Sequence, residues 1–160
     1  MRRKILLGLL LILVAIQFIR PAKNQSAGIS ANDISKGYNV PENVNEVLKK
    51  ACNDCHSNNT VYPWYSNIQP VGWWLDGHID EGKTELNFSE FISYSPKKQH
   101  HKLEEIIESV KEGGMPIKSY TWIHKNAILT DSEKLLLSEW ADNLRQEIRT
   151  KNNLPLEEKK

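Results

Sequence analysis

The five residues from Cys52 to His56 read Cys-Asn-Asp-Cys-His, and the chain contains no other cysteine. This C-x-x-C-H string is the attachment signature of a c-type haem. Two thiols at this spacing add to the two vinyl groups of haem, and the histidine after the second cysteine lies under the iron as its proximal ligand. The string therefore predicts one covalent haem, attached through Cys52 and Cys55, with His56 on the iron.

Other chemistries use the same pair of cysteines. A disulfide or a thioredoxin-like dithiol is one alternative, but a thioredoxin motif follows a strand, whereas a helical pattern runs into Cys52. A structural zinc site requires four ligands, and the chain has no second C-x-x-C or H-x-x-x-H string to supply them. Haem attachment is the favoured interpretation, with a disulfide, a dithiol or a zinc site as the alternatives.

The N-terminus combines a basic leader with an apolar segment. Residues 2–4 are Arg-Arg-Lys and residues 5–19 are almost wholly apolar, which is typical of a secretory signal. No A-x-A cleavage site follows, so we expect an uncleaved signal anchor; a signal peptide cut near Ala27 is the alternative. Fifteen residues rise roughly 22 Å, short of the ~30 Å hydrocarbon core. Snorkelling of Arg20 and Lys23 would cover this difference.

Both interpretations export the remainder of the chain, because a basic leader stays on the cytoplasmic side. We therefore expect a single-pass protein of the cell inner membrane with its haem domain in the periplasm, where bacteria attach haem c. A formal net charge of +1 over 160 residues gives no sign of nucleic-acid binding.

Apolar spacing predicts helices and long loops, with no sustained strand pattern. The fold class is therefore all-α, with helices wrapped around the cofactor. Thr130 and Glu133 form a capping-box pattern, and Gly113 is a helix stop signal. Helices are expected over 40–51, 71–80, 96–112 and 130–148, and the domains are 1–20 (anchor), 21–39 (linker), 40–150 (haem domain) and 151–160 (polar tail).

One methionine and several histidines could supply the second ligand to the iron. Met115 is the only methionine outside the leader, and it follows two glycines and precedes a proline, a setting that suits a stiff ligand loop. We predict it as the distal ligand, because thioether ligation is usual in electron carriers. His124 and His78 are the alternatives, whereas His100 and His101 lie among lysines and are expected to face solvent.

Aromatic residues are concentrated between the haem motif and the last helix. Tryptophan and tyrosine line macrocycles and donate hydrogen bonds to propionates, although an ordinary aromatic core is an equally good interpretation of any one of them. Trp140 lies on the last predicted helix and is expected in the core. The predicted pocket residues are Trp64, Trp73, Trp74 and Tyr120.

The order of helix, C-x-x-C-H, Gly-Met-Pro loop and capped last helix resembles a class I cytochrome c. Several longer strings resemble the bacterial "haem-binding domain" family of small exported proteins, over about residues 40–148. The resemblance implies a cytochrome c-like fold and covalent haem, but it names no reaction. The strings are Cys52–Asn58, Pro63–Ser66, Pro70–Trp74, Leu86–Ser89, Met115–Pro116 and His124.

Two classes of function remain open. With His56 and Met115 on the iron there is no open coordination position, so the protein would carry single electrons between redox partner proteins and would not be an enzyme. The alternative is a peroxidase-like enzyme or a gas or redox sensor with a displaceable sixth ligand, in which His124 would act as a distal base.

Overall fold

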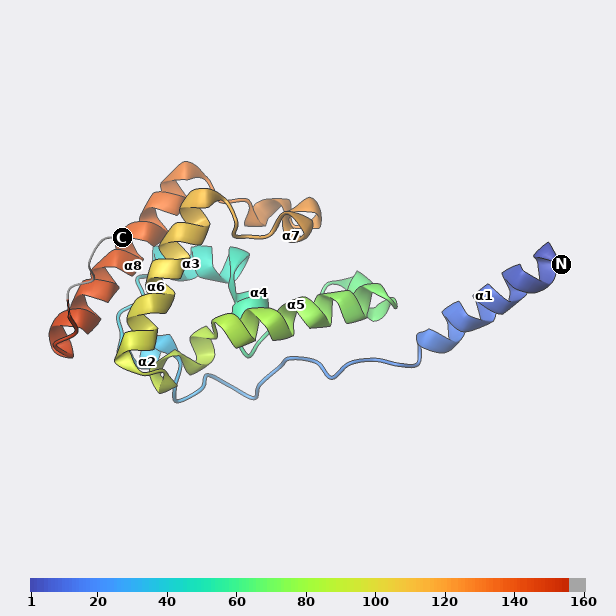
Figure 1. The fold of residues 1–160 in the computed structure, drawn as a ribbon, viewed down its shortest axis with the longest axis horizontal. Coiled ribbons are helices and arrows are strands. Elements are labelled where there is room, and N and C mark those ends of the chain that lie inside the picture. The colour runs from blue at the N-terminus through green and yellow to red at the C-terminus, as the bar shows by residue number, and fades with distance from the viewer. Residues whose placement is uncertain (156–160) are drawn as a thin grey trace.

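The computed structural model describes residues 1–155, and the described part is all-α (Figure 1). Its only β pairing is an isolated bridge between Gln25 and Asn59. The all-α character of the predicted fold is thus confirmed. The α-helices are α1 (Arg2–Ile16), α2 (Ile34–Gly37), α3 (Glu42–Ala51), α4 (Asn53–His56), α5 (Val71–Glu85), α6 (Pro96–Glu112), α7 (Lys118–Ile123) and α8 (Asp131–Lys151), and the 3-10 turns are η1 (Trp64–Asn67), η2 (Phe88–Ser93) and η3 (Lys125–Ala127).

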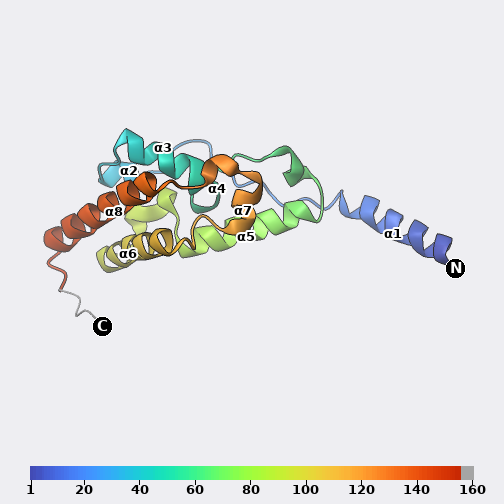
Figure 2. The same ribbon diagram turned by 90° about the horizontal axis from the view of Figure 1, so that it is seen from above.

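The hydrophobic core lies where α6 and α8 pack antiparallel and α3 crosses them (Figures 1 and 2). Each of these helices has an apolar stripe at the 3.6-residue period and buries it against the others. Trp140 is buried as expected, and its Nε1–H donates to the carbonyl of Asn39 just before α3 (3.2 Å). The stripes are Val44, Val47, Leu48 and Ala51 on α3, Leu103, Ile107 and Val110 on α6, and Leu137, Trp140, Ala141, Leu144 and Ile148 on α8.

The predicted signals at the ends of the two long helices are confirmed. Ser95 accepts a hydrogen bond from the N–H of Lys98 at the start of α6, and Gly113 ends that helix with φ +73°, a conformation that favours glycine. Thr130 and Glu133 form the reciprocal capping box of α8. Local sequence therefore fixes where these helices begin and end.

The boundaries of three predicted segments differ in the structure. The expected 71–80 helix extends to Glu85, which adds a further turn to α5. The expected linker 21–39 contains α2, whose Ile34 is buried in the core. The expected polar tail begins inside α8, and Leu154 packs against the core. Residues 156–160 of that tail lie outside the described residues. Ile34 and Leu154 are isolated apolar side chains, and residues 81–85 are polar or glycine, so none of the three carries a periodic apolar signal.

His100 is buried, with 6% of its surface exposed, so the expectation that it faces solvent was wrong. Its position explains the error: Leu103 and Ile107 lie three and seven residues later, so that His100 falls on the buried stripe of α6 despite its lysine neighbours. His101 lies on the exposed side and pairs with Glu104 and Glu105, as expected of a surface histidine.

The N-terminal helix α1 stands apart from the rest of the domain, and an extended segment connects the two (Figures 1 and 2). Within residues 1–155, no helix has both the length and the apolarity to cross a membrane. The connecting segment is held along the domain by Asn24, whose side-chain amide donates to the carbonyl of Ser57 (2.8 Å) and to Thr60 Oγ1 (2.9 Å).

Candidate functional site

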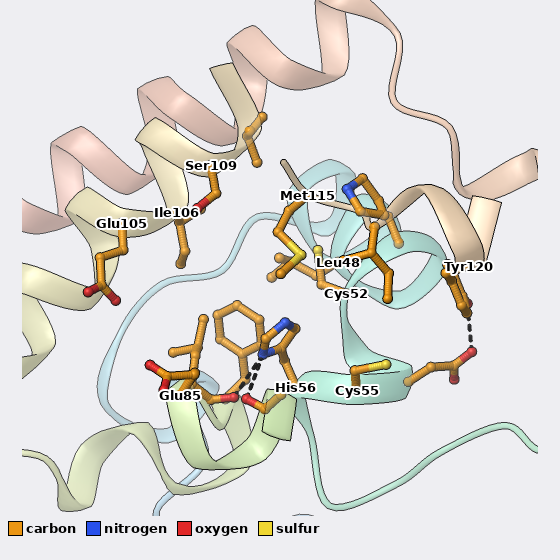
Figure 3. Close-up of a pocket in the computed structure, with 18 of the residues that line it drawn as sticks. Leu48, Cys52, Cys55, His56, Glu85, Glu105, Ile106, Ser109, Met115 and Tyr120 are labelled. Carbon is orange, nitrogen blue, oxygen red and sulfur yellow. Dashed lines mark hydrogen bonds between the residues drawn. The ribbon is translucent and has the colours of Figure 1, made fainter. Parts of the chain in front are cut away.

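A cavity of about 510 Å³ lies among α3, α4, α5, α6 and the segment after α6 (Figure 3). This volume is within the usual range of small-molecule and cofactor pockets. Residues from far apart in the sequence meet around it, including both cysteines. Among its lining residues are Leu48, Cys52, Cys55, His56, His78, Gly82, Leu86, Phe88, Lys102, Ile106, Met115, Tyr120 and Leu137.

The C-x-x-C-H string forms the short helix α4 directly after α3. The N–H groups of Cys55 and His56 both donate to the carbonyl of Cys52, at 3.1 and 3.0 Å. This turn brings both thiols and the imidazole onto the wall of one cavity (Figure 3). Both cysteines are free thiols.

Burial, with a smaller contribution from Cys55, raises the pKa of the Cys52 thiol to about 12. Burial and the charge of Asp54 raise the pKa of the Cys55 thiol to about 11. A reactive dithiol requires the opposite shift, toward the thiolate at neutral pH. The surroundings of these cysteines therefore differ from those of a redox-active C-x-x-C pair.

The ring of His56 is fixed by the backbone of the segment that ends α5. Its Nδ1 lies 2.9 Å from the carbonyl oxygen of Gly82 and 3.0 Å from that of Leu86. Because carbonyls only accept, Nδ1 carries the proton, and the lone pair of Nε2 is available to a metal. Nε2 points into the cavity (Figure 3), and the edge of Phe88 contacts the ring at a centroid distance of 6.5 Å.

Gly82 allows α5 to approach α4 this closely. A Cβ atom on Gly82 would lie 2.7 Å from the carbonyl oxygen of Cys55, closer than such atoms approach. A larger side chain would push the two helices apart and lengthen the bonds to His56. Sequence reasoning did not select this residue, although a glycine inside a helical pattern is a signal of close packing or function.

Met115 reaches the cavity from the side opposite His56 (Figure 3). The N–H groups of Gly114 and Met115 both donate to the carbonyl of Ser109, at 2.9 and 3.1 Å, so that the chain turns back after α6. The side chain remains 40% exposed. A nitrogen donor and a thioether sulfur thus face each other across the cavity.

Tyr120 lines the cavity and connects α7 to the haem motif. Its hydroxyl donates to Asp54 Oδ2 (2.8 Å), and Asp54 Oδ1 accepts from the N–H of Val61 (3.0 Å). Burial and this bond to Asp54 raise the pKa of Tyr120. The tyrosine therefore stays protonated at neutral pH and keeps its place as a donor.

The two alternative histidines lie in different places. His78 is on the cavity wall, where it packs on Trp74 with ring centroids 4.4 Å apart. His124 is not among the lining residues. It stacks on Tyr120 at 4.1 Å, and its Nε2 lies 2.6 Å from the hydroxyl of Tyr65. Its contacts hold α7 against η1.

Of the four aromatic residues expected in the pocket, Tyr120 lines the cavity. The structure places Trp64, Trp73 and Trp74 outside the lining, at the far end of α5, and each of them is exposed. Aromatic composition alone does not show which way a ring points. The apolar wall is formed instead by aliphatic residues and by Phe88, which came to notice only through the family-like string at Leu86.

The rim of the cavity is rich in carboxylates. Lys102 lies among them, with Nζ 2.7 Å from Glu105 and 3.2 Å from Glu85. Burial alone would lower the pKa of Lys102, but the hydrogen bonds to both glutamates outweigh it and raise the pKa. This lysine therefore remains charged. The lining carboxylates are Asp54, Glu81, Glu85, Glu105, Glu108 and Glu112.

These residues fit a haem. His56 presents a lone pair whose orientation is fixed from behind, and Met115 offers a soft ligand on the other side. Both thiols border the same space, and aliphatic side chains form part of the surrounding wall. Within residues 1–155, no group of three or more His, Cys, Asp or Glu side chains could hold a metal ion by itself.

The fold and the cavity define an all-α cofactor-binding domain. Residues 11–143 match the family described as "Haem-binding domain", which covers most of the chain. The protein therefore belongs to the haem-binding domain family, as the sequence strings predicted. No curated protein and no solved structure matches the chain.

Proposed function

We propose that the protein is a monohaem c-type cytochrome that carries single electrons. The observation that carries this proposal is the convergence of Cys52, Cys55, His56 and Met115 on one cavity. Haem, when bound, supplies one-electron chemistry at its iron. The chain would attach the haem through the thiols of Cys52 and Cys55, and His56 and Met115 would bind its iron, in a cytochrome c-like arrangement.

The proposed role of a carrier rests on the two candidate ligands. With His56 and Met115 both on the iron, no coordination position would be open to a substrate. The backbone bonds to His56 Nδ1 would hold its ring in one orientation when haem is bound. Redox partner proteins would exchange electrons at the exposed edge of the cofactor.

Absorption spectra of the full chain, produced in a host that attaches haem c, test this proposal. We expect haem that stays on the polypeptide after denaturation, a low-spin spectrum and the weak red charge-transfer band of a sulfur ligand. Low-spin haem without that band would transfer the distal role to His78 or His124. High-spin haem would contradict the carrier and favour the gas sensor or peroxidase-like enzyme.

We also propose that α1 tethers the domain to the outer face of the cytoplasmic membrane. The support is the basic leader, Arg2 to Lys4, followed by apolar side chains along α1, none of which is buried. A tether raises the effective concentration of the haem near membrane-bound redox partners. Alkaline carbonate extraction of cell membranes tests it: a tethered protein stays in the pellet, whereas a cleaved, freely exported domain is released.

A further inference from the structure

Several large apolar side chains are exposed at the end of the domain where α5 begins. Trp64 is 77% exposed, Trp74 is 46% exposed, and Ile68, Val71 and Trp73 lie exposed between them in the sequence. We call these five residues the tryptophan face. None of them lines the haem cavity. Large exposed apolar side chains on two elements that pack together, η1 and α5, mark a candidate interaction site.

The same stretch of chain contains no charge. Asp, Glu, Lys and Arg make up 26% of the protein, yet none occurs from Ser57 to Leu75. The connecting segment after α1 carries Arg20 and Lys23. Lys23 lies over the ring of Tyr62, with Nζ 5.3 Å from the ring centroid. The tryptophan face is thus apolar and uncharged, and the first charged residue after it along α5 is Asp76.

Hydrogen bonds join the end of α1 to this face. The side-chain amide of Gln17 donates to the carbonyl of Gln69 (3.0 Å), and its oxygen accepts from the N–H of Gln69 (2.9 Å). Trp73 Nε1–H donates to the carbonyl of Ile19 (2.8 Å). The apolar helix therefore leaves the domain at the tryptophan face, as both ribbon views show (Figures 1 and 2).

We propose that the tryptophan face rests in the headgroup region of the phospholipid bilayer into which α1 inserts. Tryptophan favours this region because its ring is apolar and its N–H is polar. Arg20 follows Ile19, whose carbonyl accepts from Trp73, so its cation would meet lipid phosphates beside the face. The inference rests on the proposed tether, since α1 brings the bilayer to this end of the domain.

This contact would set the orientation of the haem domain. The face ends at Trp74. Along the same helix, the cavity residues His78 and Gly82 lie four and eight residues further, about 6 and 12 Å by the helical rise. The cavity would be held just above the headgroups. The haem would then be presented sideways to other membrane proteins, and not buried in lipid.

Photo-crosslinking of the full haem-loaded chain in vesicles of phosphatidylethanolamine and phosphatidylglycerol tests the proposal. A benzophenone side chain replaces Trp64 in one sample and Leu135 in the other. Leu135 is the matched control, because it is 59% exposed on α8, away from α1. An unchanged haem spectrum shows that each variant is folded. We expect on the order of tenfold more lipid adduct at position 64 than at position 135, as an interfacial site requires.

A second probe in place of Trp74 guards against a local effect at position 64. Equal lipid adducts at the face and at Leu135, or adducts to a second copy of the chain, would overturn the proposal. Carbonate extraction of the same vesicles keeps the tether separate. If the protein stays in the vesicles but shows no lipid adduct at the tryptophan face, only the proposed contact of that face is contradicted. If lipid adducts form at the face but carbonate releases the protein, the contact is supported and insertion of α1 is contradicted.

Discussion

The two sides of the haem cavity are built differently. On one side, His56 has its Nδ1 bound to two backbone carbonyls and its ring packed against Phe88, with α5 pressed close at Gly82. On the other side, Met115 is held through its backbone to Ser109, and its side chain is 40% exposed. The histidine side is rigid and overdetermined. We therefore expect substitutions on the methionine side to alter the spectrum and potential of a bound haem without unfolding the domain.

Loss of both thiols should have the largest effect, because it would remove the proposed covalent attachment of the haem. We expect the Cys52→Ala/Cys55→Ala variant to retain no haem on a denaturing gel and to lose cooperative unfolding, since the cofactor would no longer fill the cavity. Thermal unfolding followed by circular dichroism measures the second effect. A native-like apo-domain with a sharp transition would show that the helices fold without haem.

Met115→Ala tests the exposed side alone. We expect the low-spin spectrum to be lost and the midpoint potential to fall by on the order of 100 mV, a fraction of the roughly 0.8 V that axial ligation spans. Stability should change little, because the side chain is partly exposed. His124→Ala is the control, as His124 is not on the cavity wall. If the spectrum changes in the His124 variant and not in the Met115 variant, His124 and not Met115 would be the distal ligand.

Two glycines of α5 provide a matched pair on the rigid side. A Cβ atom on Gly82 would collide with the backbone of Cys55, whereas one on Gly77 would meet nothing within 4 Å. Gly82→Ala should destabilise the haem-loaded protein by about 1–3 kcal/mol through overpacking. Gly77→Ala should stabilise it by up to about 1 kcal/mol through helix propensity. Denaturant unfolding measures both, and equal effects would contradict the close approach of α5 to α4.

Tyr120→Phe removes one hydrogen bond at the border between the two sides. Asp54 then loses its tyrosine donor, and we expect destabilisation of about 1–3 kcal/mol. Tyr62→Phe is the control, because its hydroxyl accepts from the N–H of Asn24 in the connecting segment. A smaller loss in the Tyr120 variant than in this control would mean that the bond to Asp54 does not hold α7.

The smallest expected effect concerns the ion pair that joins α3 to α8. Hydrogen bonds from Lys50 and from the Thr130 backbone hold the pKa of Glu133 below its ordinary value of 4.5. A lowered folded pKa adds stability that is present above pH 4.5 and is lost as the pH falls through the folded value.

Glu133→Gln keeps an acceptor for the capping box but removes this charge. We expect it to lose less than about 1 kcal/mol at neutral pH, and to flatten the acid part of the stability profile. Lys50→Met should flatten the same part from the other partner. Urea unfolding at a series of pH values measures both, and an unchanged acid slope in both variants would contradict the assigned pair.

Much of the fold could be predicted from local patterns. The stripe of Leu103, Ile107 and Val110 and the Thr130 capping box predicted α6 and α8, because period and cap chemistry are local properties. The prediction that His100 faces solvent was wrong because it relied on the neighbouring lysines and not on the helical spacing that places His100 on the buried stripe of α6. Trp64, Trp73 and Trp74 were expected at the haem because their composition suits a pocket. Their distance from it depends on the direction of α5, which no local pattern gives.

The sequence by itself determined the haem-binding character of the protein and the three residues of the haem motif, because two thiols and a histidine at that spacing have a specific chemistry. It also singled out Met115, since the chain offers no other methionine beyond the leader. Only the tertiary structure decided that Gly82 and Leu86 fix the ring of His56, and that Trp64, Trp73 and Trp74 lie exposed at the end of the domain where α5 begins. Such contacts join residues tens of positions apart, and they depend on how helices pack and not on any single segment.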